Sequence, residues 1–115
     1  MIMVADGSVD DDCCDAYPRR FATTAVGLDP TNGRFGEVTV DTCRACGASW
    51  LDYHVEYEGF TASGRWYRGR ITAEQAATLT PAEAVPLLEA LPWWISGGSY
   101  LGGVSRGSGR LAVDP

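Results

Sequence analysis

The stretch Cys43-Arg44-Ala45-Cys46-Gly47-Ala48-Ser49-Trp50 places two thiols in a C-x-x-C pattern with a glycine directly after the second. Two cysteines at this spacing can direct both sulfurs to one ion while the intervening backbone turns tightly. Gly47 can adopt the positive φ that such a turn needs, because it has no Cβ atom. The stretch therefore predicts half of a metal site. Cys13 and Cys14, the only other cysteines, are the candidates for the other half.

This knuckle resembles that of the zinc ribbon family, in which a C-x-x-C-G turn, often followed by an aromatic residue, lies between strands. The matching residues are Cys43, Cys46, Gly47 and Trp50. The resemblance covers residues 13–50 and implies zinc as the cofactor. A structural zinc ion contributes about 10 kcal/mol or more of apparent binding energy, so we expect the metal to be part of the fold.

The second knuckle departs from the family pattern. Zinc ribbons usually carry a second C-x-x-C, whereas Cys13 and Cys14 are adjacent. Neighbouring residues of an extended chain point in opposite directions, so both can bind one ion only where the backbone turns between them. The predicted ligands are Cys13, Cys14, Cys43 and Cys46, and Cys13, Asp11 and His54 all stay open as the fourth ligand.

The length and composition favour one domain in a reducing compartment. A chain of 115 residues buries about two thirds of its unfolded surface. No stretch approaches the roughly 18 consecutive apolar residues of a membrane span, and residues 1–6 lack the pattern of a secretory signal. We therefore expect a cytoplasmic protein without a membrane partner, in which four cysteines are metal ligands more often than disulfides.

Charge is concentrated near the start of the chain. The formal net charge is −6, and from residue 17 onward the balance is close to neutral. The early carboxylates are Asp6, Asp10, Asp11, Asp12 and Asp15. An acidic chain repels phosphate backbones and favours a basic protein partner.

Alternating apolar residues predict an antiparallel sheet over residues 13–71. The turn signal Asp29-Pro30-Thr31-Asn32-Gly33 separates two strand-like runs, residues 21–28 and 35–42, and so predicts a hairpin. Residues 49–58 have the clearest period of two and should be half exposed, with residues 65–71 as the antiparallel partner. Charge matching favours a register with Tyr57 opposite Tyr67, in which Glu56 meets Arg68, His54 meets Arg70 and Tyr53 faces Ile71.

Two short helices are predicted after the sheet, over residues 73–79 and 81–91. Thr72 with Gln75, and Thr80 with Glu83, each have the spacing of a capping box. Pro86 should kink or tighten the second helix near its start, because proline lacks the backbone N–H.

The remaining chain is rich in glycine and aromatic residues. We expect an ordered but irregular lobe up to residue 103 and an extended or mobile tail over residues 104–115. Residues 1–12 are expected to be a frayed acidic end. The predicted fold class is therefore α+β in a single domain: an antiparallel sheet with a zinc-ribbon-like knuckle, then two short helices (lobe 72–103) and a Gly/aromatic-rich segment.

No pattern in the sequence favours catalysis. A redox C-x-x-C usually precedes a helix, whereas Gly47 and a predicted strand follow here. His54 is the only histidine, and no serine or cysteine is spaced to form a triad with it. The sequence thus predicts a non-enzyme.

Two binding functions remain. The first is a zinc-stabilised protein-interaction module, by analogy an adaptor or an immunity or antitoxin-like factor, with large aromatic and arginine side chains as interface anchors. Its candidate partner-binding residues are Trp66, Arg68, Arg70, Trp93 and Trp94. The alternative is a nucleic-acid-binding ribbon, which the net charge disfavours. That function would use Arg44, Arg65, Arg68, Arg70 and Trp66.

Overall fold

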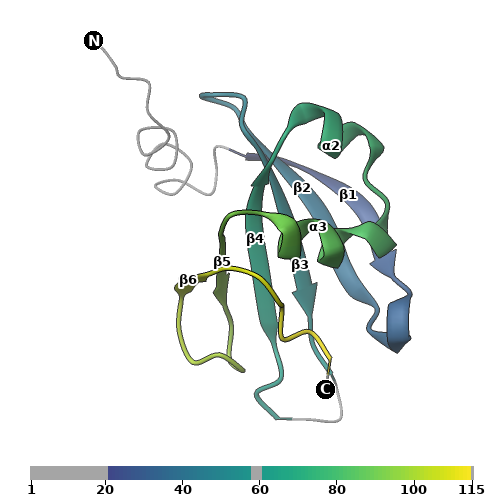
Figure 1. The fold of residues 1–115 in the computed structure, drawn as a ribbon, viewed down its shortest axis with the longest axis vertical. Helices are drawn as coiled ribbons and strands as arrows, with labels where there is room; N and C mark the ends of the chain where they lie inside the picture. The colour runs from purple at the N-terminus through teal and green to yellow at the C-terminus, as the bar shows by residue number, and fades with distance from the viewer. Residues whose placement is uncertain (1–20, 58–60, 115) are drawn as a thin grey trace.

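The computed structural model describes residues 21–57 and 61–114 and contains a six-stranded antiparallel sheet with strand order β1-β2-β3-β4-β5-β6. Every strand pairs with its neighbours in sequence, and both α-helices, which connect β4 to β5, lie on one face of the sheet (Figure 1). The strands are β1 (Phe21–Asp29), β2 (Gly36–Cys43), β3 (Ser49–Val55), β4 (Arg65–Ile71), β5 (Trp94–Gly97) and β6 (Ser105–Gly107). The helices are η2 (Thr31–Gly33), α2 (Ala73–Thr78), η3 (Pro81–Glu83) and α3 (Ala84–Ala90), where η marks a 3-10 turn. The expected antiparallel sheet followed by two short helices is confirmed.

The main core lies between the sheet and α3. Alternate residues of β3 and β4, such as Leu51, Tyr53 and Tyr67, point to this side and are buried, together with Val85 and Leu88 of α3. The period of two thus predicted the buried face of both strands correctly.

The register between β3 and β4 differs from the predicted one. Tyr53, not Tyr57, pairs with Tyr67, and Asp52, not Glu56, pairs with Arg68. The shift is an even number of residues, so the same side chains face the core in both registers. Charge matching failed because this face of the strand carries more than one acidic residue, Asp52 and Glu56 among them, so an acidic residue can meet Arg68 in more than one alignment.

The predicted hairpin is present as β1 and β2. Its connection includes η2, where Asn32 and Gly33 have φ angles of 54° and 69°. The Asp29 side chain accepts the backbone N–H of Thr31 at 2.9 Å and so fixes the start of the turn.

The two helices begin at the predicted caps. Thr72 Oγ1 accepts the backbone N–H of Gln75 at 3.0 Å, and the Gln75 side chain accepts the N–H of Thr72 at 2.8 Å. Glu83 likewise accepts the N–H of Thr80 at 3.0 Å. The second helix begins with a tight 3-10 turn, η3, as expected from Pro86, which has no N–H for the Ala82 carbonyl.

The chain after α3 is more regular than predicted. The expected irregular lobe contains β5, which pairs with β4 from Trp66 to Arg68, and the expected tail begins with β6. Beyond β6, Leu111 and Val113 are buried in the main core. Residues 111–114, which we call the strap, therefore complete the core on the helix side of the sheet.

Candidate functional site

The cysteine turn closes the end of the β2–β3 hairpin. Cys43 is the last residue of β2, and its N–H donates to the Ala48 carbonyl at 2.8 Å. The Gly47 N–H donates to the Cys43 carbonyl at 2.8 Å, and Gly47 has a φ of 77°, as the sequence predicted. Cys43 is buried and Cys46 is exposed. The backbone thus turns tightly over residues 43–48, with one thiol buried and the other exposed.

Only part of the predicted metal site lies within the described residues. Cys13, Cys14 and Asp11 lie outside the described residues. Within residues 21–57 and 61–114 no group of three or more potential ligands is close enough to hold a metal. His54 lies five residues beyond Ser49 on β3, about 16 Å along a strand. His54 is therefore remote from the cysteine turn, which corrects its place among the possible fourth ligands.

A small aromatic cluster lies on the sheet face opposite the helices, which we call the open face. Cys43, Ala48 and Trp50 are buried there, with Phe21 and Trp93 packed against them. The rings of Trp50 and Trp93 meet edge to face with centroids 6.1 Å apart. Trp50 was expected on a half-exposed face but is 1% exposed, because this cluster covers it.

Arg68 lies at the centre of the open face and contacts two aspartates. Its Nη1 is 2.6 Å from Asp41 Oδ2 and also forms an ion pair with Asp52. Thr23 Oγ1 donates to Asp41 Oδ1 at 2.7 Å. The guanidinium also stacks over Phe21, 4.5 Å from the ring centroid, and over Trp50, 5.0 Å away. These contacts hold Arg68 firmly between the acidic pair and the aromatic cluster.

The two aspartates have opposite pKa shifts. Burial, together with the neighbouring Asp41, raises the pKa of Asp52 to about 7. Burial also opposes ionisation of Asp41, but hydrogen bonds from protonated Asp52, Thr23 and Arg68 outweigh it and lower the pKa of Asp41. Around neutral pH the pair therefore shares one proton.

Four of the five predicted partner-binding residues lie on the open face. Trp66, Arg68 and Arg70 alternate along β4, and Trp93 packs beside Trp50 with Arg106 over its ring at 3.9 Å. Trp94 lies on the opposite face, where it is buried in the main core and its Nε1 donates to the Gly109 carbonyl at 3.1 Å.

The arginines of the nucleic-acid alternative do not share one surface. Arg44 is exposed in the cysteine turn, and Arg68 is engaged by two carboxylates. Arg65 is buried on the helix side, against the rings of Tyr57 and Tyr100. This set therefore does not form a continuous basic track.

Sequence reasoning missed several open-face residues. Asp41 was not singled out, and Asp52 was considered only as a neighbour of His54, although each lies on the same face of its strand as Arg68. Phe21 and Arg106 were also missed, since Phe21 contacts Arg68 from a distant strand and Arg106 contacts Trp93 across a strand pair, and no local pattern signals either contact. An even-numbered shift of the β3–β4 register would have brought Asp52 opposite Arg68.

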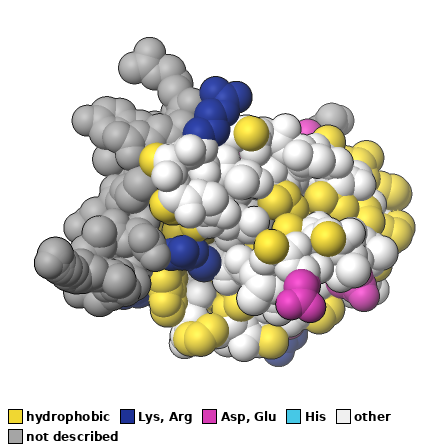
Figure 2. Space-filling view, turned by 90° about the horizontal axis from the view of Figure 1, so that it is seen from above, with side chains coloured by type: hydrophobic (Ala, Val, Ile, Leu, Met, Phe, Trp, Pro, Cys, Tyr) yellow, Lys and Arg dark blue, Asp and Glu magenta, His cyan; other side chains and the backbone are white. Residues whose placement is uncertain are grey.

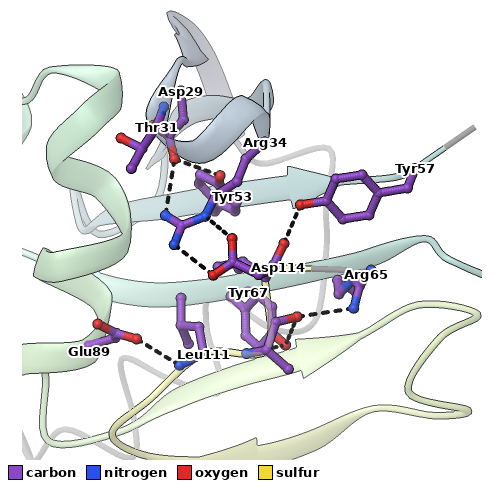
Figure 3. Close-up of polar contacts among 12 residues, drawn as sticks. Asp29, Thr31, Arg34, Tyr53, Tyr57, Arg65, Tyr67, Glu89, Leu111 and Asp114 are labelled. Atoms are coloured by element: carbon purple, nitrogen blue, oxygen red, sulfur yellow. Dashed lines mark hydrogen bonds and ion pairs between the residues drawn. The ribbon is translucent and has the colours of Figure 1, made fainter.

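A second polar network lies on the helix side (Figure 3). Asp29 is fully buried and accepts the Tyr53 hydroxyl at 2.7 Å, with Arg34 Nη1 at 3.6 Å. Burial opposes ionisation of Asp29, but its hydrogen bonds from Thr31 and Tyr53 outweigh this effect and lower its pKa. Arg34 continues the network to Asp114 of the strap. This network is structural in character, because its groups are buried or paired with one another.

The described surface is less acidic than the whole sequence. Figure 2 views the end of the molecule at which α2 lies, and acidic side chains are few there while hydrophobic ones gather on one side. An open groove of about 410 Å³ lies between α2 and the first two strands and is lined only by small or uncharged residues, such as Thr24, Val40 and Ala76.

Comparison of the chain with models of known protein families, with curated proteins and with solved structures finds no match. None of the helices in residues 21–57 and 61–114 has the length and apolar character needed to cross a bilayer.

Proposed function

We propose that this chain is a non-catalytic protein-interaction module whose fold is stabilised by zinc. The observation that carries the proposal is the open face: Trp93 with Arg106, and Arg68 with Phe21 and Trp50, form stacked arginine–aromatic pairs beside the cysteine turn. Tryptophan and arginine are the residues most enriched among the energetic centres of protein interfaces. A basic partner fits the acidic balance of the chain, and an adaptor or an immunity-type inhibitor would use such a face.

The metal part of the proposal rests on the cysteine turn. Its tight hydrogen-bonded turn and the positive φ of Gly47 support a C-x-x-C metal site here. In the proposed site Cys43 and Cys46 bind zinc with Cys13 and Cys14, as the resemblance to zinc ribbons implies. Zinc would then anchor the acidic segment beside the open face, since Cys43 belongs to the aromatic cluster.

Zinc content tests the metal. Protein purified without chelator should contain about one zinc ion per chain by mass spectrometry, and Cys43→Ser or Cys46→Ser should remove it and unfold the chain. Ala45→Ser is the matched control, because it adds a hydroxyl to the same turn and keeps both thiols. Metal-free wild-type protein with an unchanged melting curve would exclude the zinc site.

Affinity capture from the native host tests the interaction face. Trp93→Ser and Arg106→Ala should each lose a partner that the wild-type chain captures, whereas Phe35→Ser, which changes an exposed aromatic residue elsewhere, should keep it. Equal capture by the wild-type chain and all three variants would mean that the interface lies outside this face. Salt-sensitive binding of labelled RNA or DNA, lost on replacing Arg68 and Arg70, would favour the nucleic-acid function instead.

A further inference from the structure

The strap, residues 111–114, lies in the main core as a bound peptide would. Its side chains alternate, with Leu111 and Val113 only 5% and 1% exposed and Ala112 and Asp114 exposed. An extended peptide that buries every second side chain uses one face for affinity and leaves the other in solvent.

The main chain of the strap is bound by side chains of the body. Leu111 N–H donates to Glu89 Oε2 at 2.9 Å, and the Tyr57 hydroxyl donates to the Val113 carbonyl. The Tyr67 hydroxyl accepts the Ala112 N–H at 3.1 Å and lies 3.2 Å from the Ala112 carbonyl. Among the described residues no backbone–backbone hydrogen bond joins the strap to a strand. The body thus contacts both main-chain donors and acceptors without adding a strand to the sheet (Figure 3).

An arginine binds the acidic residue of the strap. Arg34 donates to the two carboxylate oxygens of Asp114 at 2.7 and 3.1 Å, and this carboxylate raises the pKa of Arg34 further. Bidentate arginine–carboxylate pairs add geometric selectivity as well as energy. The site therefore selects an acidic residue three positions after the first apolar one.

A second arginine in the site has unused donors. Arg65 is 2% exposed and donates from Nη1 to the Ala112 carbonyl at 3.2 Å, but its Nε has no acceptor. No carboxylate of residues 21–57 and 61–114 forms an ion pair with it. Buried guanidinium groups are usually paired, and the described residues offer this one the Ala112 carbonyl and the rings of Tyr57 and Tyr100 but no carboxylate, so a more acidic segment than the strap would suit it.

A short connection that contains Gly109 joins β6 to the strap. β6 ends at Gly107, and Gly109 has a φ of 78°, which favours glycine. The contacts before the strap include the bond from Trp94 Nε1 to the Gly109 carbonyl. The strap can therefore leave the site without breaking a strand pair.

We propose that the strap occupies a peptide-binding groove, and that the groove binds in trans an acidic extended segment of a partner protein. The segment would have an apolar residue, any residue, a second apolar residue and an acidic residue in succession. Arg34 and Arg65 complement its charge, and the strap competes with it from within the chain. The groove lies on the opposite face from Cys43, so this inference does not depend on the zinc site.

The test uses the full chain with the strap released. Leu111→Asp together with Val113→Asp places two charges in the core and displaces the strap. A labelled peptide of residues 109–115 should bind this variant at least about tenfold more tightly than it binds the wild-type chain, because a tethered competitor acts at millimolar effective concentration. Fluorescence anisotropy measures both affinities.

Three controls define the site. Ala112→Asp changes an exposed strap residue and should behave as the wild type does. The peptide carrying Asp at positions 111 and 113 should not bind. Adding Arg34→Ala to the released variant should weaken binding of the natural peptide several-fold but leave a peptide with Asn at position 114 unaffected.

Each outcome of the peptide-binding test either supports the groove or overturns it. A folded released variant that does not bind the peptide, or that binds it no better than the wild-type chain, would overturn it. Where the released variant is unfolded, recovery of a cooperative melting transition on adding peptide supports the groove, and no recovery overturns it. A wild-type dimer that disappears on releasing the strap would assign the groove to a second copy and overturn the partner-segment proposal.

Discussion

On the open face, Asp41 and Asp52 compete for one nitrogen of Arg68. One positive charge cannot neutralise two half-buried carboxylates, so one aspartate keeps its proton to a pH well above its usual range. Hydrogen bonds from Thr23 and Arg68 favour the ionised form of Asp41, so Asp52 carries the raised pKa. The pair gives the molecule a titrating group near neutrality.

Asp52→Asn should flatten the pH dependence of stability between about pH 4 and pH 7. Below the unfolded value of 3.8, Asp52 is protonated in both states and its contribution is complete. As the pH rises towards 7, the unfolded chain loses this proton while the folded chain keeps it, so the free energy of unfolding falls. Asparagine cannot ionise, yet its amide can still donate to Asp41. Urea unfolding of both proteins across this range measures the difference, and parallel curves would contradict the raised pKa.

Tyr53→Phe should lower the free energy of unfolding by about 1–3 kcal/mol, because it removes a hydrogen bond from the fully buried Asp29 carboxylate. Chemical denaturation at neutral pH measures the loss. Tyr100→Phe is the matched control, since that ring is exposed and the change should stay within about 0.5 kcal/mol. Equal effects of the two substitutions would mean that the Asp29 bond contributes nothing.

At the scale of elements, β5 depends on one glycine for its approach to β4. A Cβ atom at Gly98 would lie 2.5 Å from the Gly64 carbonyl oxygen and 2.7 Å from the Arg65 Cα, and the φ of Gly98 is 114°. Backbone atoms cannot rotate away from such a contact as a side chain can. The pairing of β4 with β5 therefore requires glycine here.

Gly98→Ala should destabilise the fold by about 2–4 kcal/mol, through overpacking and an unfavourable φ. Gly103→Ala is the matched control, because its added methyl group would meet nothing within 4 Å. Thermal melting compares the two variants with the wild-type chain. A melting temperature of the Gly98 variant equal to that of the control would contradict the close approach of β5.

Elements with a local signal could be predicted from the sequence, and pairings without one could not. The β1–β2 hairpin has a strong turn signal, and Thr72 with Gln75 marks the start of α2, so both were correct. Only the alternation of buried and exposed side chains defines the β3–β4 register. A shift by any even number of residues keeps that alternation.

Long-range contacts were the least predictable part of the site. The alternation Leu111-Ala112-Val113-Asp114 is a strand-like signal, but it is short and follows glycine and serine, so it was interpreted as tail. Arg34 and Asp114 are 80 residues apart, and no local pattern joins them. The Asp41–Arg68 pair was missed for the same reason, as it crosses three strands.

At the scale of the whole molecule, the sheet separates two surfaces with different chemistry. The helix side is closed by α3 and the strap, and most of its polar groups, apart from Arg65 Nε, are paired with one another or with the strap. The open face carries the aromatic cluster, Arg68 and the cysteine turn. A single sheet can thus present two independent binding sites.

Amide hydrogen exchange should be slowest in β2, β3 and β4 and fastest in β6. The central strands have partners on both sides and lie under the core, whereas β6 pairs only with β5 and is mostly exposed. Mass spectrometry of exchanged peptides measures the order. Protection of residues 105–107 equal to that of β3 would contradict the edge position of β6.

The strap also affects how the chain folds during synthesis. The ribosome makes residues 111–114 after all six strands, yet these residues contact Arg34, Tyr57, Tyr67 and Glu89. A nascent chain that has already formed its hairpins and α3 would still expose the part of the core that Leu111 and Val113 cover. Chaperones should therefore have their main opportunity to bind in the interval before the strap emerges from the exit tunnel.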